Sequence, residues 1–231
     1  MQVQTYSKER VPKRLLKENQ PYLTDLMARI LSSPKISKPE IMIPSFGFVG
    51  EMASGKNTYA DELKAQLESE FGVLVHRPSF SAKIIDLAVE LFGMEGKDRL
   101  LIGEFAAKMR EIDPQVWVKY VIRDILENDR LPFAADGLRF STDAELFRKS
   151  FDNLVVIRIE ADFSQRMSAY KMTYGRYPTQ AELNNKGEGD MQNIQCDLSL
   201  FNNYEAADMK AQISRIVEKI REGTLFELLR Q

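Results

Sequence analysis

The sequence is poor in the residues that build disulfides and zinc sites. Its 231 residues include one cysteine, Cys196, and one histidine, His76. A single cysteine excludes an internal disulfide and suits a reducing compartment, so we expect a cytoplasmic protein. Without a Cys/His cluster, a structural zinc site is not expected. His76 ends a short apolar run, where we expect a structural rather than a catalytic histidine.

Long apolar runs and a large net charge are also absent. No apolar run approaches the roughly 20 residues of a membrane-spanning helix, and the first residues lack the apolar core of a signal peptide. The formal net charge of -2 gives no general attraction to nucleic acid or to an anionic membrane. We therefore expect neither as a partner, and no feature specifies an oligomeric state. With 44% hydrophobic residues, the chain can build the core of one α/β domain, with or without an appendage.

Residues 1–40 differ in composition from the rest of the chain. Their first part is basic, with Lys8, Arg10, Lys13, Arg14 and Lys17. Apolar residues then recur at helical spacing between Tyr22 and Leu31. One interpretation is a basic arm that binds a partner or a nucleic acid; the favoured one is a solvated extension with a helix docked on the core. We accordingly divide the chain into an N-terminal extension, 1–40, and a domain, 41–231.

The most informative stretch runs from Gly50 to Thr58. It reads G-x-x-x-x-G-K, ends an apolar run and precedes a helical pattern, which is the context of a phosphate-binding loop (P-loop). Its glycines let backbone N–H groups point at a phosphate, and the following helix adds the positive end of its dipole. Lys56 would reach the outer phosphates. The usual next residue, Ser or Thr, holds magnesium; here it is Asn57. The predicted nucleotide-binding residues of the loop are Gly50, Ala53, Ser54, Gly55, Lys56, Asn57 and Thr58.

The rest of the domain alternates predicted strands and helices. Strands are predicted at 42–49, 73–76, 131–135 and 154–159, and a fifth from 196. Helices are predicted at 56–71, 82–92, 98–112, 114–126, 143–149 and 213–220. This order predicts an α/β fold of the P-loop NTPase class, with a doubly wound, parallel, five-stranded sheet flanked by helices. Ligands of such a sheet bind at the carboxyl ends of its strands.

Several candidate site residues follow from this arrangement. Asp136 ends the third predicted strand, where a magnesium-organising carboxylate belongs, although Asp-Gly is also a common turn. Asp136 and Arg139 would meet Gly50 at one edge of the sheet. Arg110 and Trp117 lie on predicted helices between the second and third strands. Trp117 could stack on a base, but its spacing favours packing.

Two longer segments have compositions that fit substrate handling. The stretch 161–195 combines basic residues with glycines, and its apolar periodicity weakens after Met172. A lid that closes over phosphates has this composition, and so does a charged surface loop. The helical stretch at about 80–130 is the candidate acceptor-binding region.

The motifs occur in the order found in one kinase family. The run 54–61 resembles the S-G-K-D-T-x-A-D loop of phage-type deoxynucleoside monophosphate kinases. The runs 79–83, 110–118 (with Gly103) and 136–140 (with Glu145) follow in that family's order. Asp197 followed by Asn202 resembles an ending shared with dephospho-coenzyme A kinases. The similarity covers roughly residues 43 to 220 and is patchy between the motifs.

The resemblance implies transfer of the γ-phosphoryl group of ATP, with Mg²⁺, to a small-molecule acceptor, a (deoxy)nucleoside monophosphate. It implies that Thr58 touches an inner phosphate and that Asn57 and Asp136 meet the metal. Asn57 stands where the family often has Asp and, being neutral, would hold the ion more weakly. The implied catalytic residues are Lys56, Asp136, Arg139 and Arg166. The implied substrate-binding residues are Arg110, Arg139 and Trp117, with Arg176 in the lid and Asn202 near the donor adenine.

Three interpretations stay open. The first is a nucleoside monophosphate kinase, and the second is a dephospho-coenzyme A kinase or another small-molecule kinase on the same fold. The third is a nucleotide-gated binding protein whose basic arm engages a partner. The arginines and the predicted lid favour an enzyme, whereas Asn57 and the extension keep the third interpretation open.

Overall fold

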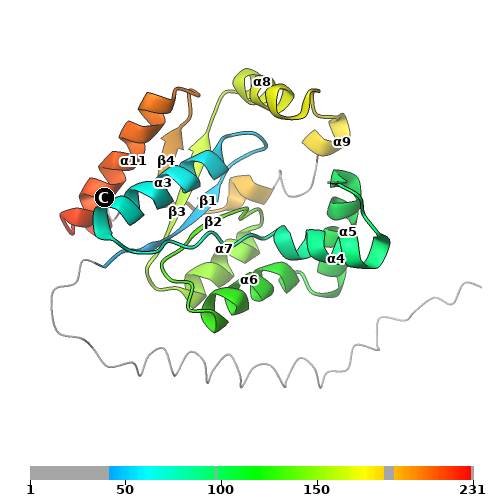
Figure 1. The fold of residues 1–231 in the computed structure, drawn as a ribbon, viewed down its shortest axis with the longest axis horizontal. Helices are drawn as coiled ribbons and strands as arrows, with labels where there is room; N and C mark the ends of the chain where they lie inside the picture. Colours follow the sequence, from blue (N-terminus) through cyan, green and yellow to red (C-terminus); the bar gives the residue numbers. More distant parts are fainter. Residues whose placement is uncertain (1–41, 97, 185–189, 230–231) are drawn as a thin grey trace, which may run out of the picture. The chain divides into compact units, whose positions relative to one another are not determined.

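The computed structural model describes residues 42–96, 98–184 and 190–229 (Figure 1). The extension predicted over residues 1–40 lies outside the described residues. Its helix and its role therefore stay predictions. None of the described helices is long and apolar enough to cross a membrane.

Strands and helices alternate along the described chain. In chain order they are β1 (Ser45–Val49), α3 (Lys56–Phe71), α4 (Ala82–Phe92), α5 (Arg99–Ile112), α6 (Val116–Glu127), β2 (Ala134–Asp136), α7 (Ser141–Ser150), β3 (Leu154–Glu160), α8 (Phe163–Tyr174), α9 (Gln180–Leu183), the 3-10 turn η1 (Met191–Asn193), β4 (Leu198–Phe201), α11 (Ala206–Arg221) and α12 (Leu225–Leu228).

The described strands form one parallel sheet in the order β2–β1–β3–β4. In the central strand, Phe48 pairs with Asp136 of β2 and with Ile157 of β3. All carboxyl ends therefore lie at one edge of the sheet, where the loop after β1 and the loop after β2 are neighbours. The predicted α/β fold with a parallel sheet flanked by helices is confirmed.

The prediction of five strands is wrong, because the described residues contain four. The segment 73–76 is not a strand, although it lies along the outer edge of β2. It and the residues after it pair there through isolated parallel bridges, His76 with Phe133 and Ser79 with Asp136.

Side chains of α3 bond to this segment at Val75, and a proline follows it. The Val75 N–H donates to Glu68 Oε1 at 2.9 Å, and Lys64 Nζ donates to the Val75 carbonyl oxygen at 2.9 Å. Pro78, three residues later, has no N–H to donate. An apolar run of four residues predicts a buried strand, but here the pairing with β2 consists of isolated bridges, with the His76 N–H bonded to the Pro132 carbonyl oxygen and the Ala134 N–H to the His76 carbonyl oxygen.

Helices cover both faces of the sheet. On one face α3 and α11 lie side by side (Figure 1), and Phe46, Phe48 and Ile157 are buried against them in one core cluster. On the other side, the rings of Phe147 and Phe151, in and after α7, stack edge-on against Phe133, with centroids 5.8 and 4.9 Å away. All of β1 and most of β3 are buried, as expected of parallel strands that helices cover on both faces.

Candidate phosphate-binding site

The loop between β1 and α3 has the backbone of an anion-binding turn. Ala53 and Gly55 have positive φ angles of 59° and 90°. Gly50 allows a close approach, because a Cβ there would lie 2.5 Å from Ser54 Oγ and 2.8 Å from the Ile159 carbonyl oxygen. Successive N–H groups in such a loop can converge on a phosphate. The phosphate-binding geometry predicted from Gly50 to Lys56 is therefore compatible with the fold.

Gly55 is the residue at which the loop becomes a helix. It is the N-cap of α3 and, having no side chain, leaves the first N–H groups of that helix without a side-chain cap. A Cβ at Gly55 would lie 2.4 Å from Asn202 Nδ2, so the position requires glycine for both its φ angle and its space. An uncapped helix start following a positive-φ loop favours a bound anion.

The segment after β4 supports the loop from outside. Asn202 is 6% exposed; its Nδ2 donates to the Ser54 carbonyl oxygen at 2.9 Å, and its Oδ1 accepts from the Tyr204 N–H at 2.8 Å. The Tyr204 hydroxyl donates to the Ala53 carbonyl oxygen at 2.6 Å. The structure thus places Asn202, implied by resemblance to lie near an adenine, directly against the loop backbone.

Arg166 supports the loop from α8. Its side chain is 8% exposed, Nη2 lies 2.6 Å from Glu51 Oε2, and Nη1 donates to the Met52 carbonyl oxygen at 3.3 Å. Glu51 and Met52 are loop residues, so Arg166 contacts the loop itself rather than a distant lid. No motif marks Glu51 as its partner, and sequence reasoning missed this pair.

The first turn of α3 presents the remaining predicted donor-side residues. Lys56 Nζ lies over the loop and donates to the Glu51 carbonyl oxygen at 3.3 Å. Asn57 and Thr58 are exposed on the same turn. The three side chains therefore start from the helix end that faces the loop.

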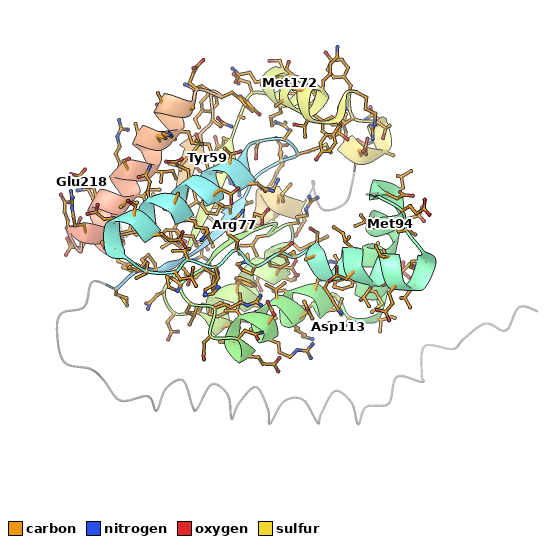
Figure 2. All side chains as sticks on the ribbon, in the orientation of Figure 1. Tyr59, Arg77, Met94, Asp113, Met172 and Glu218 are labelled. Atoms are coloured by element: carbon orange, nitrogen blue, oxygen red, sulfur yellow. The ribbon has the colours of Figure 1, made fainter. Side chains whose placement is uncertain are left out.

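Asp136 lies at the carboxyl end of β2, beside the central strand, and its side chain is 23% exposed. Arg77, between α3 and the sheet (Figure 2), lies next to it, with Nη2 3.7 Å from Asp136 Oδ1. Arg139 is half-buried in the loop that follows β2. The predicted meeting of the loop after β1 with Asp136 and Arg139 is consistent with the register, whereas Arg77 was missed because no motif includes it.

The oxygen donors at this edge fit Mg²⁺ better than a transition metal. Within the described residues, no group of three or more His, Cys, Asp or Glu side chains could hold a metal alone. Magnesium is typically held by one or two carboxylates together with substrate phosphates. Asp136 offers one such carboxylate, and Asn57 and Thr58 carry neutral oxygens on the first turn of α3.

Arg110, implied by resemblance to bind the acceptor, is held in a buried ion pair. Its Nη2 and Nη1 donate to the two oxygens of Asp143 at 2.8 and 3.2 Å, and its guanidinium lies 4.1 Å from the ring centroid of Phe140. Asp143 is 1% exposed, and burial raises the pKa of its carboxyl group while the hydrogen bonds from Arg110 lower it. The structure therefore gives Arg110 a role in joining α5 to α7.

Trp117 lies in the interior between α5 and α6. It is 3% exposed, its Nε1 donates to the Ala106 carbonyl oxygen at 3.1 Å, and its ring meets Phe105 edge-on at 6.0 Å. Stacking on a base would require these helices to separate. The packing that its spacing favoured is what the structure shows.

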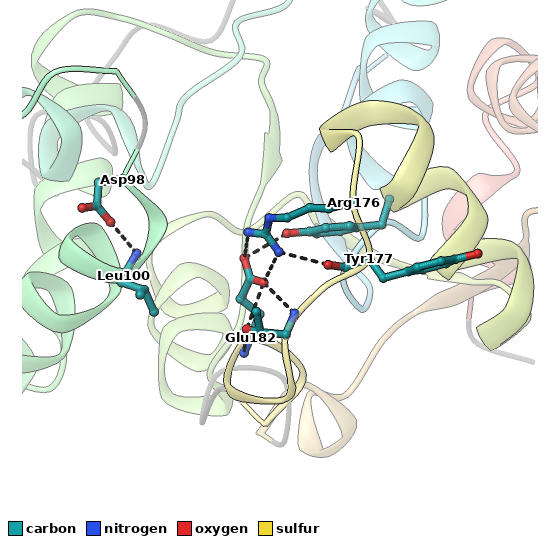
Figure 3. Close-up of polar contacts among 7 residues, drawn as sticks. Asp98, Leu100, Arg176, Tyr177 and Glu182 are labelled. Atoms are coloured by element: carbon teal, nitrogen blue, oxygen red, sulfur yellow. Dashed lines mark hydrogen bonds and ion pairs between the residues drawn. The ribbon is translucent and has the colours of Figure 1, made fainter.

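The lid predicted over 161–195 is not confirmed. Its first part is helix α8, whose Arg166, Met167 and Tyr170 are buried, and residues 185–189 lie outside the described residues. Arg176, the other predicted lid arginine, donates to both oxygens of Glu182 at 2.8 and 2.9 Å (Figure 3). These bonds, above all, hold the pKa of Glu182 far below its usual range.

No family model matches the sequence, and no curated protein matches it. Among solved structures, the fold is similar to a gluconokinase from Sinorhizobium meliloti 1021, at 11% identity and a TM-score of 0.50, over 78% of this chain and 97% of that one. It is also similar to shikimate kinase from Acinetobacter baumannii in complex with shikimate, at 14% identity and a TM-score of 0.50, over 80% and 96% of the two chains. These likenesses show that the chain shares the α/β fold of these two structures.

Proposed function

We propose that the chain transfers the γ-phosphoryl group of ATP to a small-molecule acceptor. The observation that carries the proposal is the loop from Gly50 to Gly55. It combines positive φ angles, glycines required by close approach and an uncapped helix start, all at the carboxyl edge of a parallel sheet. This edge is where nucleotides bind in open α/β sheets. The fold shared with small kinases is consistent with the proposal.

The chain's own residues would act by position and charge, because phosphoryl transfer asks for little covalent work from a protein. The loop amides and Lys56 would hold the donor phosphates. Arg166 already reaches the loop, and a bound phosphate would compete with Glu51 for its guanidinium. Asp136 and Asn57 would hold Mg²⁺, which when bound neutralises charge on the phosphates.

A (deoxy)nucleoside monophosphate is the first acceptor to test, on the strength of the motif order around Arg139 and Asp136. The acceptor's phosphate would meet Arg139, which follows β2 at the same edge as the P-loop. Arg110, the other arginine that the resemblance assigns to the acceptor, is paired with Asp143.

The pairing of Arg110 with Asp143 favours a second class of candidate acceptors. These carry hydroxyl groups in place of a phosphate, so that their binding requires fewer arginines. Arg176 is engaged with Glu182 in the same way. Gluconate and shikimate, taken from the names of the two similar structures, represent this class. Dephospho-coenzyme A represents the other kinase chemistry that the motifs suggest.

The test is a coupled assay of ADP release from ATP with each acceptor in turn. The panel holds the ribo- and deoxynucleoside monophosphates, dephospho-coenzyme A, gluconate and shikimate, and Lys56→Ala is measured beside the wild type. Acceptor-dependent ADP release that is lost in Lys56→Ala supports a kinase and identifies its acceptor.

Two other outcomes would redirect the proposal. Tight ATP binding without turnover on any acceptor would favour the nucleotide-gated binding protein. Absence of ATP binding in a folded protein would overturn the phosphate-loop assignment itself.

A further inference from the structure

Arg77 contacts two elements of the fold, α3 and β2. Its Nε donates to Asp61 Oδ1 of α3 at 2.8 Å, and its Nη1 donates to the Ala134 carbonyl oxygen of β2. Its Nη2 lies 3.7 Å from Asp136 Oδ1. The Arg77 side chain is 20% exposed, so water reaches little of this cation.

The third contact is longer than the first. At 3.7 Å the ion pair with Asp136 lies outside hydrogen-bonding distance, whereas the ion pair with Asp61 has ordinary hydrogen-bond length. Asp61 and Ala134 therefore fix the guanidinium. Its positive charge acts on Asp136 without taking a hydrogen-bonding position on that carboxylate.

We propose that Arg77 sets the order in which metal and nucleotide bind. A fixed positive charge beside Asp136 opposes Mg²⁺ binding to the protein alone, so the metal enters together with the ATP phosphates, whose negative charge exceeds that of one arginine. The proposal rests on the proposed function, because it assumes that Asp136 is the carboxylate facing the metal.

The size of the effect follows from charge and distance. Asp136 is only partly buried, so the surroundings are closer to water than to a dry interior. For a divalent ion and a unit charge several ångströms apart in such surroundings, we expect repulsion equivalent to about tenfold in metal affinity. Only charge produces this effect, so a lysine at position 77 retains it in part and a glutamine loses it.

The experiment measures Mn²⁺ binding by electron paramagnetic resonance, with the full chain and no nucleotide. Arg77→Gln is expected to bind Mn²⁺ about tenfold more tightly than the wild type, and Arg77→Lys to lie between them. Arg123→Gln is the matched control, because it removes the same charge from an exposed position on α6, where the side chain is 55% exposed. The double variant Arg77→Gln/Asp136→Asn should not show the tighter Mn²⁺ binding of Arg77→Gln. An Arg77→Gln affinity equal to that of Arg123→Gln overturns the proposal.

A second variant keeps the test decisive if Arg77→Gln does not fold. If Arg77 masks Asp136, then Asp136→Asn alone changes nucleotide-free Mn²⁺ affinity by less than about twofold. The same variant should weaken Mn²⁺ binding clearly once a non-hydrolysable ATP analogue is present. A large loss without nucleotide overturns the proposal. Neither readout uses turnover, so a failure of the proposed kinase activity is distinguishable from a failure of this binding order.

Discussion

Similar side chains have different roles around the P-loop and in the helical region of α5, α6 and α7. Around the loop, Arg166, Asn202 and Tyr204 all contact backbone carbonyl oxygens of loop residues. In the helical region, Arg110 and Trp117 contact elements of the helical packing itself. The first three side chains hold the backbone of the P-loop in its conformation, and Arg110 and Trp117 hold helices together.

The comparison shows that residue type alone does not separate binding from packing. Arg166 and Arg110 are each paired with one carboxylate, and neither is well exposed. They differ in the partner: Glu51 is a loop residue that is 45% exposed, whereas Asp143 is buried in α7. An exposed partner can be exchanged for a phosphate at low cost, and a buried one cannot.

The largest expected effect is at the loop. Lys56→Ala should lower turnover on the order of 100- to 1000-fold, because it removes one preorganised charge from the transferring phosphates. Its thermal unfolding should match that of the wild type, since Lys56 starts a helix and packs no core. ADP release and circular dichroism measure both, with Lys108→Ala on the exposed side of α5 as the control. Near-normal turnover would mean that the loop is not the donor site.

Arg110→Ala should act on stability rather than on a ligand. It leaves Asp143 buried without its charge partner, which typically costs about 3 kcal/mol in free energy of unfolding. Burial then raises the pKa of Asp143 unopposed. When the folded-state pKa of a carboxyl group is raised, the folded protein is more stable at low pH and loses that stability as the pH rises through the raised pKa. The loss of unfolding free energy in Arg110→Ala should therefore be smaller at about pH 5 than at about pH 8. Urea titrations at the two pH values test this.

Arg139→Ala is the contrasting variant at the sheet edge. It should raise the Michaelis constant for the acceptor about tenfold or more, with that for ATP unchanged. If Arg110→Ala instead raises the acceptor's Michaelis constant at unchanged stability, the distinction between the two regions fails.

Asn202→Ala should weaken ATP binding about tenfold, because it removes the donor that holds the Ser54 carbonyl oxygen in the loop. Calorimetry with a non-hydrolysable ATP analogue measures the change. Asn203→Ala is a matched control. The side chain of Asn203 does not bond to Ser54 but accepts a hydrogen bond from the Glu205 N–H through its Oδ1. Equal affinities of the two variants would show that the loop holds its shape without this support.

The smallest effect is expected at Trp117. Trp117→Phe should cost about 1 kcal/mol of unfolding free energy through loss of its bond to Ala106, and leave the kinetics unchanged. Trp117 is the only tryptophan in the chain, so its fluorescence in the wild type reports directly on this position. Quenching by an acceptor at saturating concentration would place the ring at the substrate after all.

The sequence predicts the parts of the fold that depend on contiguous residues. The loop from Gly50 to Lys56 and the alternation of strands and helices are local patterns, and both appear in the structure. The segment 73–76 was mispredicted because it pairs with the sheet through an isolated bridge at His76, while Val75 is bonded to side chains of α3, which no local pattern encodes.

The ion-pair partners of the charged side chains could not be predicted from the sequence either. Arg110 and Asp143 are 33 residues apart, and Arg166 and Glu51 lie on different elements. Only the fold brings such pairs together. A motif can thus identify an arginine as a candidate site residue. Whether that arginine faces a ligand or a buried carboxylate depends on the packing of the fold.

The irregular segment beside β2 also bears on how copies of the chain behave in a crowded solution. A sheet edge with unpaired backbone groups is a template for strands from other molecules and hence for aggregation. Here the Val75 N–H and carbonyl group are already bonded to Glu68 and Lys64, and Pro78 interrupts the row. Because the described residues form no fifth strand here, this edge of the sheet is a poor template for intermolecular β-pairing.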